Sequence, residues 1–111
     1  SWPACLPESI AMGATMPDNS VASYSNHDAL LVDFHARGTT VLYGLDAKKT
    51  NFAGSSASVL VGATSWATVK AAKSQLSYTD LYSLLLKTST PTKNSRIAKA
   101  NLINIQAALN G

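Results

Sequence analysis

Cysteine, charge and long apolar runs are all scarce in this sequence, and each shortage excludes a class of protein. Cys5 is the only cysteine among 111 residues, which excludes an internal disulfide framework and a metal site built from several cysteines. No run of 18 apolar residues occurs, so the sequence predicts no membrane-spanning helix. Charged residues make up 14% and hydrophobic residues 46% of the chain, a balance that indicates one globular domain rather than disorder.

The formal net charge of +3 is unevenly distributed along the chain. Residues 1–46 contain five acids and one base, whereas residues 47–111 contain eight bases and one acid, Asp80. A basic half can attract an anionic partner. These bases are scattered, however, and no aromatic residues alternate with them as a surface for stacking nucleotide bases would require. We therefore expect neither nucleic acid nor a membrane as a partner.

The first half of the chain predicts strands. Short apolar or β-branched runs bounded by turn-forming residues are typical of strands. We expect such strands at residues 9–14, 30–34 and 39–43. Turns are expected between them and again at residues 44–49, before the chain changes character.

The second half predicts three helices. Apolar residues recur at helical spacing from Ala57 to a turn at residues 74–75, and small residues dominate this helix, which favours very close packing. Ser77 followed by Asp80 is a variant of the capping box and predicts a second helix to about Thr88. A third short helix is expected over residues 101–109.

A flexible turn, Gly54-Ser55-Ser56, leads directly into the first of these helices. It places a serine hydroxyl at a helix start, where unpaired backbone N–H groups and the positive end of the helix dipole favour negative charge. A nucleophilic serine and its developing oxyanion can use both. The alternative is that Ser55 or Ser56 only caps the helix.

Six segments in order resemble the C-terminal portion of subtilisin-like serine peptidases, the subtilases. Residues 2–14 are similar to the family's YPA–YP–VIAVGA segment, and residues 52–58 (FAGSSAS) resemble the nucleophile motif, usually written GTSMA. The other four are residues 21–26 (VASYSN), 32–39 (VDFHARGT), 76–91 and 102–109. The resemblance covers essentially the whole chain. It implies an α/β fold: part of a mostly parallel sheet, the nucleophile helix and two C-terminal helices.

The resemblance also implies site residues. It makes Ser56 the nucleophile, with Ser55 beside the oxyanion in place of the usual Thr. The carbonyls of Pro7 and Ser9, with the Asp33 carboxylate, match a calcium site of some relatives, and a hard cation bound by oxygens is chemically sensible. The alternative for Asp33 is a structural, hydrogen-bonding acid.

Two further alternatives concern the nucleophile and its base. Residues 62–68 (GATSWAT) also resemble the nucleophile motif, but Ser65 would then lie inside the helix that starts after Ser56, so spacing favours Ser56. His27 and His35 are the only histidines, and neither aligns with the family's catalytic base. We expect both to be ordinary, partly exposed side chains. A self-contained serine hydrolase using one of them stays open.

In this family the aspartate and histidine of the triad precede the serine. Those two residues and the oxyanion asparagine would lie upstream of Ser1. The resemblance therefore predicts that residues 1–111 are the C-terminal segment of one catalytic domain, a subunit or fragment of a secreted serine endopeptidase. Its partner would be an upstream chain of the same cleaved peptidase. After Ser56 the residues read ASVLV, where the family usually has MATPH, which favours the alternative of a pseudoenzyme acting as a binding or structural module.

Overall fold

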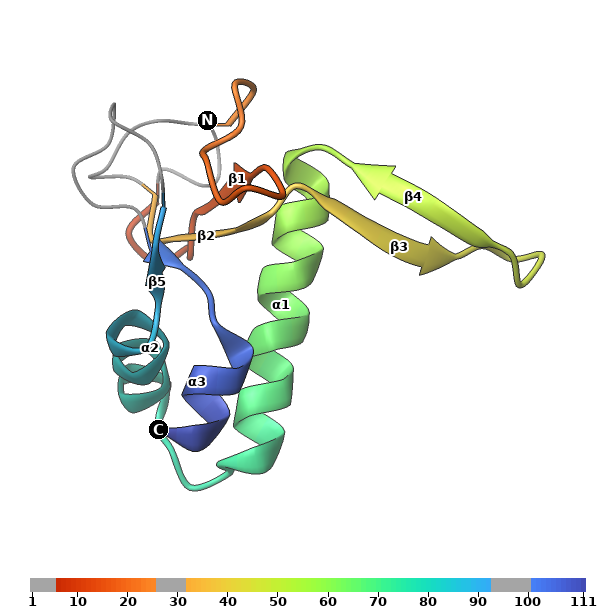
Figure 1. The fold of residues 1–111 in the computed structure, drawn as a ribbon. Helices are drawn as coiled ribbons and strands as arrows, with labels where there is room; N and C mark the ends of the chain where they lie inside the picture. The colour runs from red at the N-terminus through yellow and green to blue at the C-terminus, as the bar shows by residue number, and fades with distance from the viewer. Residues whose placement is uncertain (1–5, 26–31, 93–100) are drawn as a thin grey trace.

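The computed structural model describes residues 6–25, 32–92 and 101–111, and its elements form a small sheet, a projecting hairpin and three helices (Figure 1). His27, expected to be a partly exposed side chain, and the start of the strand expected at residues 30–34 lie outside the described residues. The sheet has the order β1-β2-β6-β5. Its strands are β1 (Met12–Thr15), β2 (Phe34–Arg37), β6 (Asn101–Leu102) and β5 (Thr90–Pro91).

The strands β1 and β2 form the main parallel pair of the sheet, with Met12 opposite Phe34 and Thr15 opposite Arg37. β2 also pairs in parallel with β6, whereas β5 runs antiparallel to β6. The outer edge of β1 is partly closed, because the Ala14 carbonyl accepts a hydrogen bond from the N–H of Ala22 at 2.9 Å. β2 therefore lies inside the sheet and β1 at its margin.

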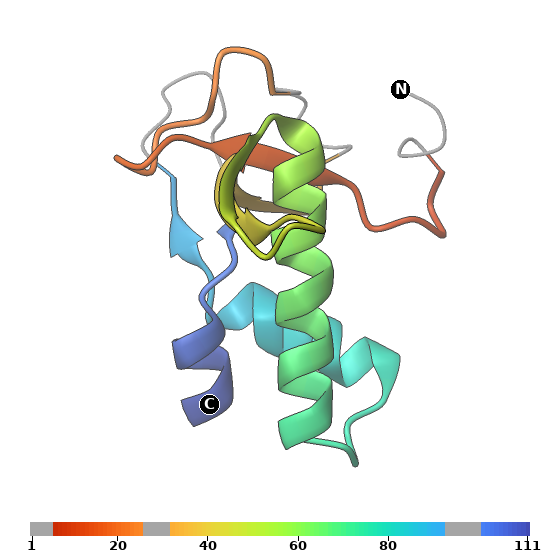
Figure 2. The same ribbon diagram turned by 90° about the vertical axis from the view of Figure 1, so that its right-hand side faces the viewer.

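The next two strands leave this sheet and form an antiparallel hairpin. β3 (Thr39–Tyr43) pairs with β4 (Lys49–Ala53) from Thr39 opposite Ala53 to Tyr43 opposite Lys49. Gly44 donates its N–H to the Lys48 carbonyl at 2.9 Å and closes the connecting turn. Figures 1 and 2 show the hairpin as an arm that projects from the body beside the start of α1.

Three helices lie to one side of the sheet, and the longest of them runs from the sheet to the opposite end of the molecule (Figures 1 and 2). They are α1 (Ser55–Ala72), α2 (Tyr78–Lys87) and α3 (Ile105–Asn110). The Ser77 side chain accepts the Asp80 N–H at 3.2 Å and caps α2, as its sequence predicts. Asn104 caps α3 in the same way, through the Ala107 N–H at 3.0 Å.

The core lies where the helices meet the inner strand. Its fully buried members come from β2, α1, α2 and α3: Phe34, Val69, Leu81, Leu85 and Ala108. Half-buried apolar side chains surround it, among them Met12, Trp66 and Tyr82. Leu81 and Leu85 are four residues apart, so they lie on one face of α2 and bury it against the core.

The expectation of a mostly parallel sheet is wrong. In the described residues, residues 39–43 belong to the hairpin, and the four-stranded sheet mixes parallel with antiparallel pairs. The reason is the short turn after β3: strands joined by so short a connection can only pair antiparallel, whereas parallel strands need a long crossover. The first two strands also lie about three residues later than expected, and the third helix begins at Ile105 because Asn101 and Leu102 pair as β6.

Candidate functional site

The start of α1 is built on an unusual glycine. Gly54 has φ 114° and ψ 177°, a backbone conformation that is essentially confined to glycine. Its N–H donates to the Gly38 carbonyl at 2.8 Å, which ties the helix start to the base of the hairpin. Gly54 is the N-cap residue, and no side chain caps the helix. Neither Ser55 nor Ser56 is therefore a helix cap, although a cap is the simplest interpretation of the sequence.

Ser55 and Ser56 occupy the exposed first turn of α1. The first-turn N–H groups of a helix lack partners within the helix and carry the positive end of its dipole. The next serine is different: Ser58 is fully buried and donates its hydroxyl to the Ser55 carbonyl at 2.6 Å. Ser55 and Ser56 are thus the two hydroxyls that the helix start presents to solvent.

Ser65, the centre of the rival motif, lies in the middle of α1 and is fully buried. Its hydroxyl donates to the Val61 carbonyl at 2.7 Å, one turn earlier in the same helix. This bond to the i−4 carbonyl is a common way for a serine inside a helix to satisfy its hydroxyl. The spacing argument against Ser65 therefore agrees with the structure.

His35 is buried, only 2% exposed, and not the partly exposed side chain that the sequence suggests. It lies on the inner strand β2, opposite Gly13 of β1. A Cβ atom at Gly13 would come within 2.5 Å of His35 Nε2, so the missing side chain of Gly13 makes room for the imidazole. His35 therefore packs between strands, whereas Ser56 is exposed at the helix start.

Asp33 forms a second polar centre, immediately before β2. One carboxylate oxygen accepts the Ala11 N–H at 2.7 Å and the other accepts the Tyr82 hydroxyl at 2.8 Å. Burial of Tyr82, together with the hydrogen bond to and the negative charge of Asp33, raises the pKa of Tyr82 to about 12. Asp33 is therefore the structural, hydrogen-bonding acid that was one of its two predicted roles.

The three residues expected to bind calcium line one cavity beside this centre. Pro7, Ser9 and Asp33 face a space of about 230 Å³, with Tyr78 and Tyr82 from α2 on its other side. Each carboxylate oxygen of Asp33 keeps one lone pair after accepting its hydrogen bond. Within the described ranges, no three His, Cys, Asp or Glu residues gather as a metal-binding group. The residues present therefore fit weak calcium binding at most, because Asp33 is the single charged ligand among them.

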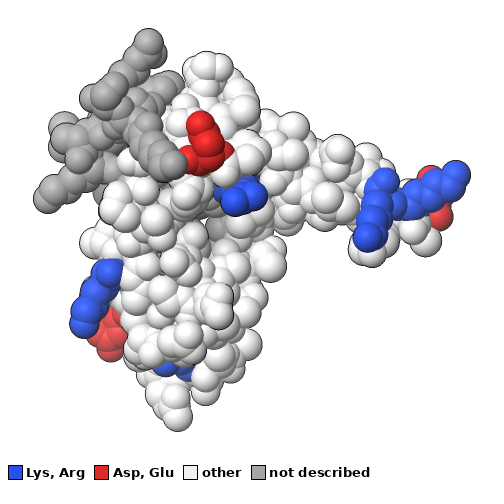
Figure 3. Space-filling model, in the orientation of Figure 1, with Lys and Arg blue, Asp and Glu red and all other residues white. Residues whose placement is uncertain are grey.

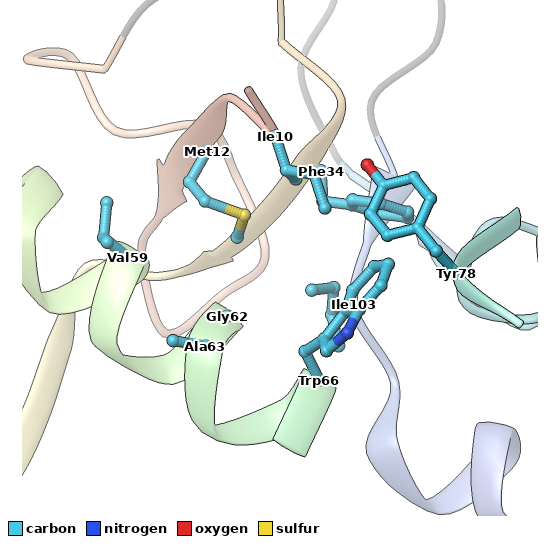
Figure 4. A pocket seen from close by; sticks show the side chains of 9 residues that line it. All are labelled: Ile10, Met12, Phe34, Val59, Gly62, Ala63, Trp66, Tyr78 and Ile103. Atoms are coloured by element: carbon cyan, nitrogen blue, oxygen red, sulfur yellow. The ribbon is translucent and has the colours of Figure 1, made fainter. Parts of the chain in front are cut away.

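An apolar cleft is the feature that the sequence interpretation missed. It has a volume of about 380 Å³ and lies between α1, the sheet and the start of α2 (Figure 4). Its lining is entirely uncharged: Ile10, Met12, Phe34, Val59, Gly62, Ala63, Trp66, Tyr78 and Ile103. The one feature of the sequence that could have indicated the cleft is the segment that forms α1, whose 18 residues include a single charge, Lys70.

The charged side chains of the described residues are scattered over the face of the molecule seen in Figure 3. Figure 3 shows Lys and Arg in separate places, with one group at the end of the hairpin arm. That group is Lys48 and Lys49 beside Asp46, whose carboxylate accepts the Lys48 N–H at 3.1 Å. The described part of the chain also has no helix that combines the length and the apolar character needed to span a bilayer.

Comparison with known proteins identifies the fold only through solved structures. Neither a family model nor a curated protein matches the sequence. The A-subunit of the AB5 toxin from E. coli superposes with a TM-score of 0.78 at 18% sequence identity. The chain has the fold of part of a toxin A-subunit. A structure of the subtilase cytotoxin SubAB, described for its assembly, matches with a TM-score of 0.75 at 19% identity.

Both toxin likenesses cover 98% of this chain but only 42% and 41% of the neighbours' chains. This chain therefore spans well under half the length of the toxin chains it resembles. In each of them the matched region and the remainder belong to one polypeptide. We expected an upstream chain of a cleaved peptidase as the partner. This prediction is wrong, since the neighbours are toxin proteins, the A-subunit of an AB5 toxin and SubAB.

The assignment of this chain to a subtilisin-like serine endopeptidase is corrected as well. The matching folds are those of toxin proteins, and at 18% and 19% identity they establish a fold and bring no activity with it. Subtilase is part of the name of the second neighbour, the cytotoxin SubAB, and describes that protein. The predicted family, subtilisin-like fold and peptidase class are therefore wrong, and the chain has an A-subunit-like fold. The pseudoenzyme alternative gains no clear support from these likenesses.

Proposed function

We propose that this chain serves as part of a toxin-like A-subunit and that the start of α1, with Ser56, is the site that faces its target. Support for the first half is the A-subunit-like fold over 98% of the chain. One observation carries the second half: Gly54 occupies the N-cap position and no side chain caps α1, so Ser56 is an exposed residue that does not serve as a cap.

The helix start favours chemistry at a hydroxyl group. Unpaired N–H groups and the helix dipole stabilise negative charge, both on an ionising hydroxyl and on an oxygen that becomes charged during attack. Ser56 would form a covalent bond to an electrophilic centre of the target only if a general base removes its proton. The one described histidine, His35, is buried against Gly13, so it is not offered as this base, and we expect the base outside the described residues.

The test is covalent labelling of the longest polypeptide encoded by the gene, with a fluorophosphonate probe that reacts with activated serines. We expect labelling of the unmodified protein and its loss in Ser56→Ala. Ser74→Ala is the matched control, since Ser74 is also exposed and follows the end of α1. Labelling that persists in Ser56→Ala, or no labelling of the unmodified protein, contradicts the assignment of Ser56.

The toxin-like role has a separate readout. Expression of the same polypeptide inside cultured animal cells should arrest their growth, and Ser56→Ala should restore growth while the protein accumulates to a similar level. Equal growth with the unmodified protein and with an empty vector would contradict the toxin-like role. Growth arrest that Ser56→Ala retains would leave that role standing and remove Ser56 from it.

A further inference from the structure

The helix α1 carries a single charge and yet leaves large apolar side chains exposed to solvent. Lys70 is its only charged residue, and five of its 18 residues are buried. Val59 is 53% and Leu60 39% exposed. Large apolar side chains on a helix are normally covered by protein, because exposed apolar surface is unfavourable in water. The sequence of α1 therefore fits a position inside a larger structure.

The uncovered face of α1 borders the apolar cleft. Val59, Gly62, Ala63 and Trp66 follow one another at the i, i+3, i+4, i+7 spacing and form one wall of it (Figure 4). Gly62 touches the opposite wall, since a Cβ atom there would lie 2.7 Å from the terminal methyl carbon of Met12.

Aromatic rings line the cleft where α2 begins. Tyr78 is 60% exposed, and its ring centroid lies 5.3 Å from that of Trp66. Two rings held this way offer a broad apolar surface with little rotamer freedom to lose on contact. Among the described residues no charged side chain lines the cleft, so they offer no counter-ion to a charged ligand.

We propose that this cleft receives an apolar helix from the remaining part of the A-subunit-like fold, carried on the same polypeptide. The toxin chains it resembles are more than twice as long as the matched region, so a further layer of protein is available in that architecture. Small side chains such as Gly62 and Ala63 allow two helix axes to approach to about 8–10 Å. The proposal rests on α1 and the fold, and it does not depend on the reactivity of Ser56.

The test measures how accessible Ala63 is in the longest polypeptide that the gene encodes. The native cysteine is first removed as Cys5→Ser, and single cysteines are then introduced as Ala63→Cys and, as the control, Ser74→Cys. Both positions are exposed in residues 1–111, and Ser74 lies in the turn that ends α1, away from the cleft lining. Modification by a maleimide is followed under native and under denaturing conditions.

If a helix fills the cleft, Ala63→Cys should react at least about 100-fold more slowly in the native state than when denatured, because it becomes accessible only through local opening. Ser74→Cys should react at similar rates in both states. Native rates within about threefold of each other at the two positions would overturn the proposal. A gene that encodes no residues beyond these 111 would overturn it too. A circular dichroism spectrum with native helix content confirms that each variant is folded.

Discussion

At the scale of the single residue, the candidate site at the start of α1 depends on Gly54. Its φ of 114° is strained for any residue with a side chain, although an added Cβ atom would meet nothing within 4 Å. Gly54→Ala should therefore destabilise the protein through backbone strain alone, by about 1–3 kcal/mol. Urea unfolding measures the loss.

Gly44→Ala is the control for this substitution. No left-handed φ applies at Gly44, and a Cβ atom there would approach only the end of the flexible Asp46 side chain, at 3.0 Å. Gly44→Ala should lower the free energy of unfolding clearly less than Gly54→Ala does. Equal losses at the two glycines would show that the conformation of Gly54 is not strained.

The raised pKa of Tyr82 predicts how the free energy of unfolding depends on pH. Its pKa is raised from 10.0 to about 12 in the folded protein. Between these two values the unfolded chain loses the phenolic proton while the folded chain keeps it, so the free energy of unfolding falls as pH rises. The contribution of Tyr82 is complete below pH 10 and disappears as pH rises through about 12.

Tyr82→Phe isolates this effect from the other groups that titrate in alkali. Urea unfolding at a series of pH values should show a steeper fall above pH 10 for the unmodified protein than for the variant. Parallel curves would mean that the pKa of Tyr82 is not raised in the folded protein. Below pH 10, the variant should be less stable because Asp33 loses one hydrogen-bond donor.

Among the elements, α2 was predicted almost to the residue, and the reason is local. Ser77 and Asp80 specify its start through one hydrogen bond, and its leucines specify the buried face. Removing the cap as Ser77→Ala should cost about 1 kcal/mol of unfolding free energy. Ser83→Ala, at an exposed position within the same helix, should change it much less; equal effects would contradict the capping role.

The strands were harder to predict because their partners are distant in sequence. β6 consists of Asn101 and Leu102, which pair with β2 and β5 and carry no strand signal of their own. β4 was interpreted as a connection, since Lys49–Ala53 is polar and exposed and is fixed only by its partner β3. Pairing across the fold decides such segments, whereas helix caps and periodicity are visible within a few residues.

At the scale of the whole molecule, the sequence predicted the local placement of the candidate residues better than their surroundings, and their functional roles stay predictions. The Gly54-Ser55-Ser56 turn does begin a helix, and Pro7, Ser9 and Asp33 do line one cavity. The burial of His35 was missed, because the space beside Gly13 exists only once β1 and β2 are paired. The apolar cleft was missed because its lining comes from five separate segments of the chain.

The predicted calcium site would join distant parts of the molecule. We therefore test it through the stability of the whole protein. Pro7 and Ser9 precede β1, Asp33 precedes β2, and Tyr82 lies on α2, so an ion in the cavity would hold three segments together. A site with one charged ligand and neutral oxygens is expected to be weak, with a dissociation constant of about 1 mM. At about 10 mM calcium, such binding adds roughly 1.4 kcal/mol to the free energy of unfolding.

We therefore expect about 10 mM calcium to raise the melting temperature by roughly 4 °C, a shift reasonable for a domain of this size. Magnesium should raise it less, because it requires a stricter octahedral geometry and gives up its water reluctantly. Asp33→Asn lowers the melting temperature by itself, through its two hydrogen bonds, so the informative quantity is the further change on adding calcium. That change should vanish in Asp33→Asn. An equal calcium effect with and without the Asp33 carboxylate would place the ion elsewhere, and no effect on the unmodified protein would leave Asp33 with its structural role alone.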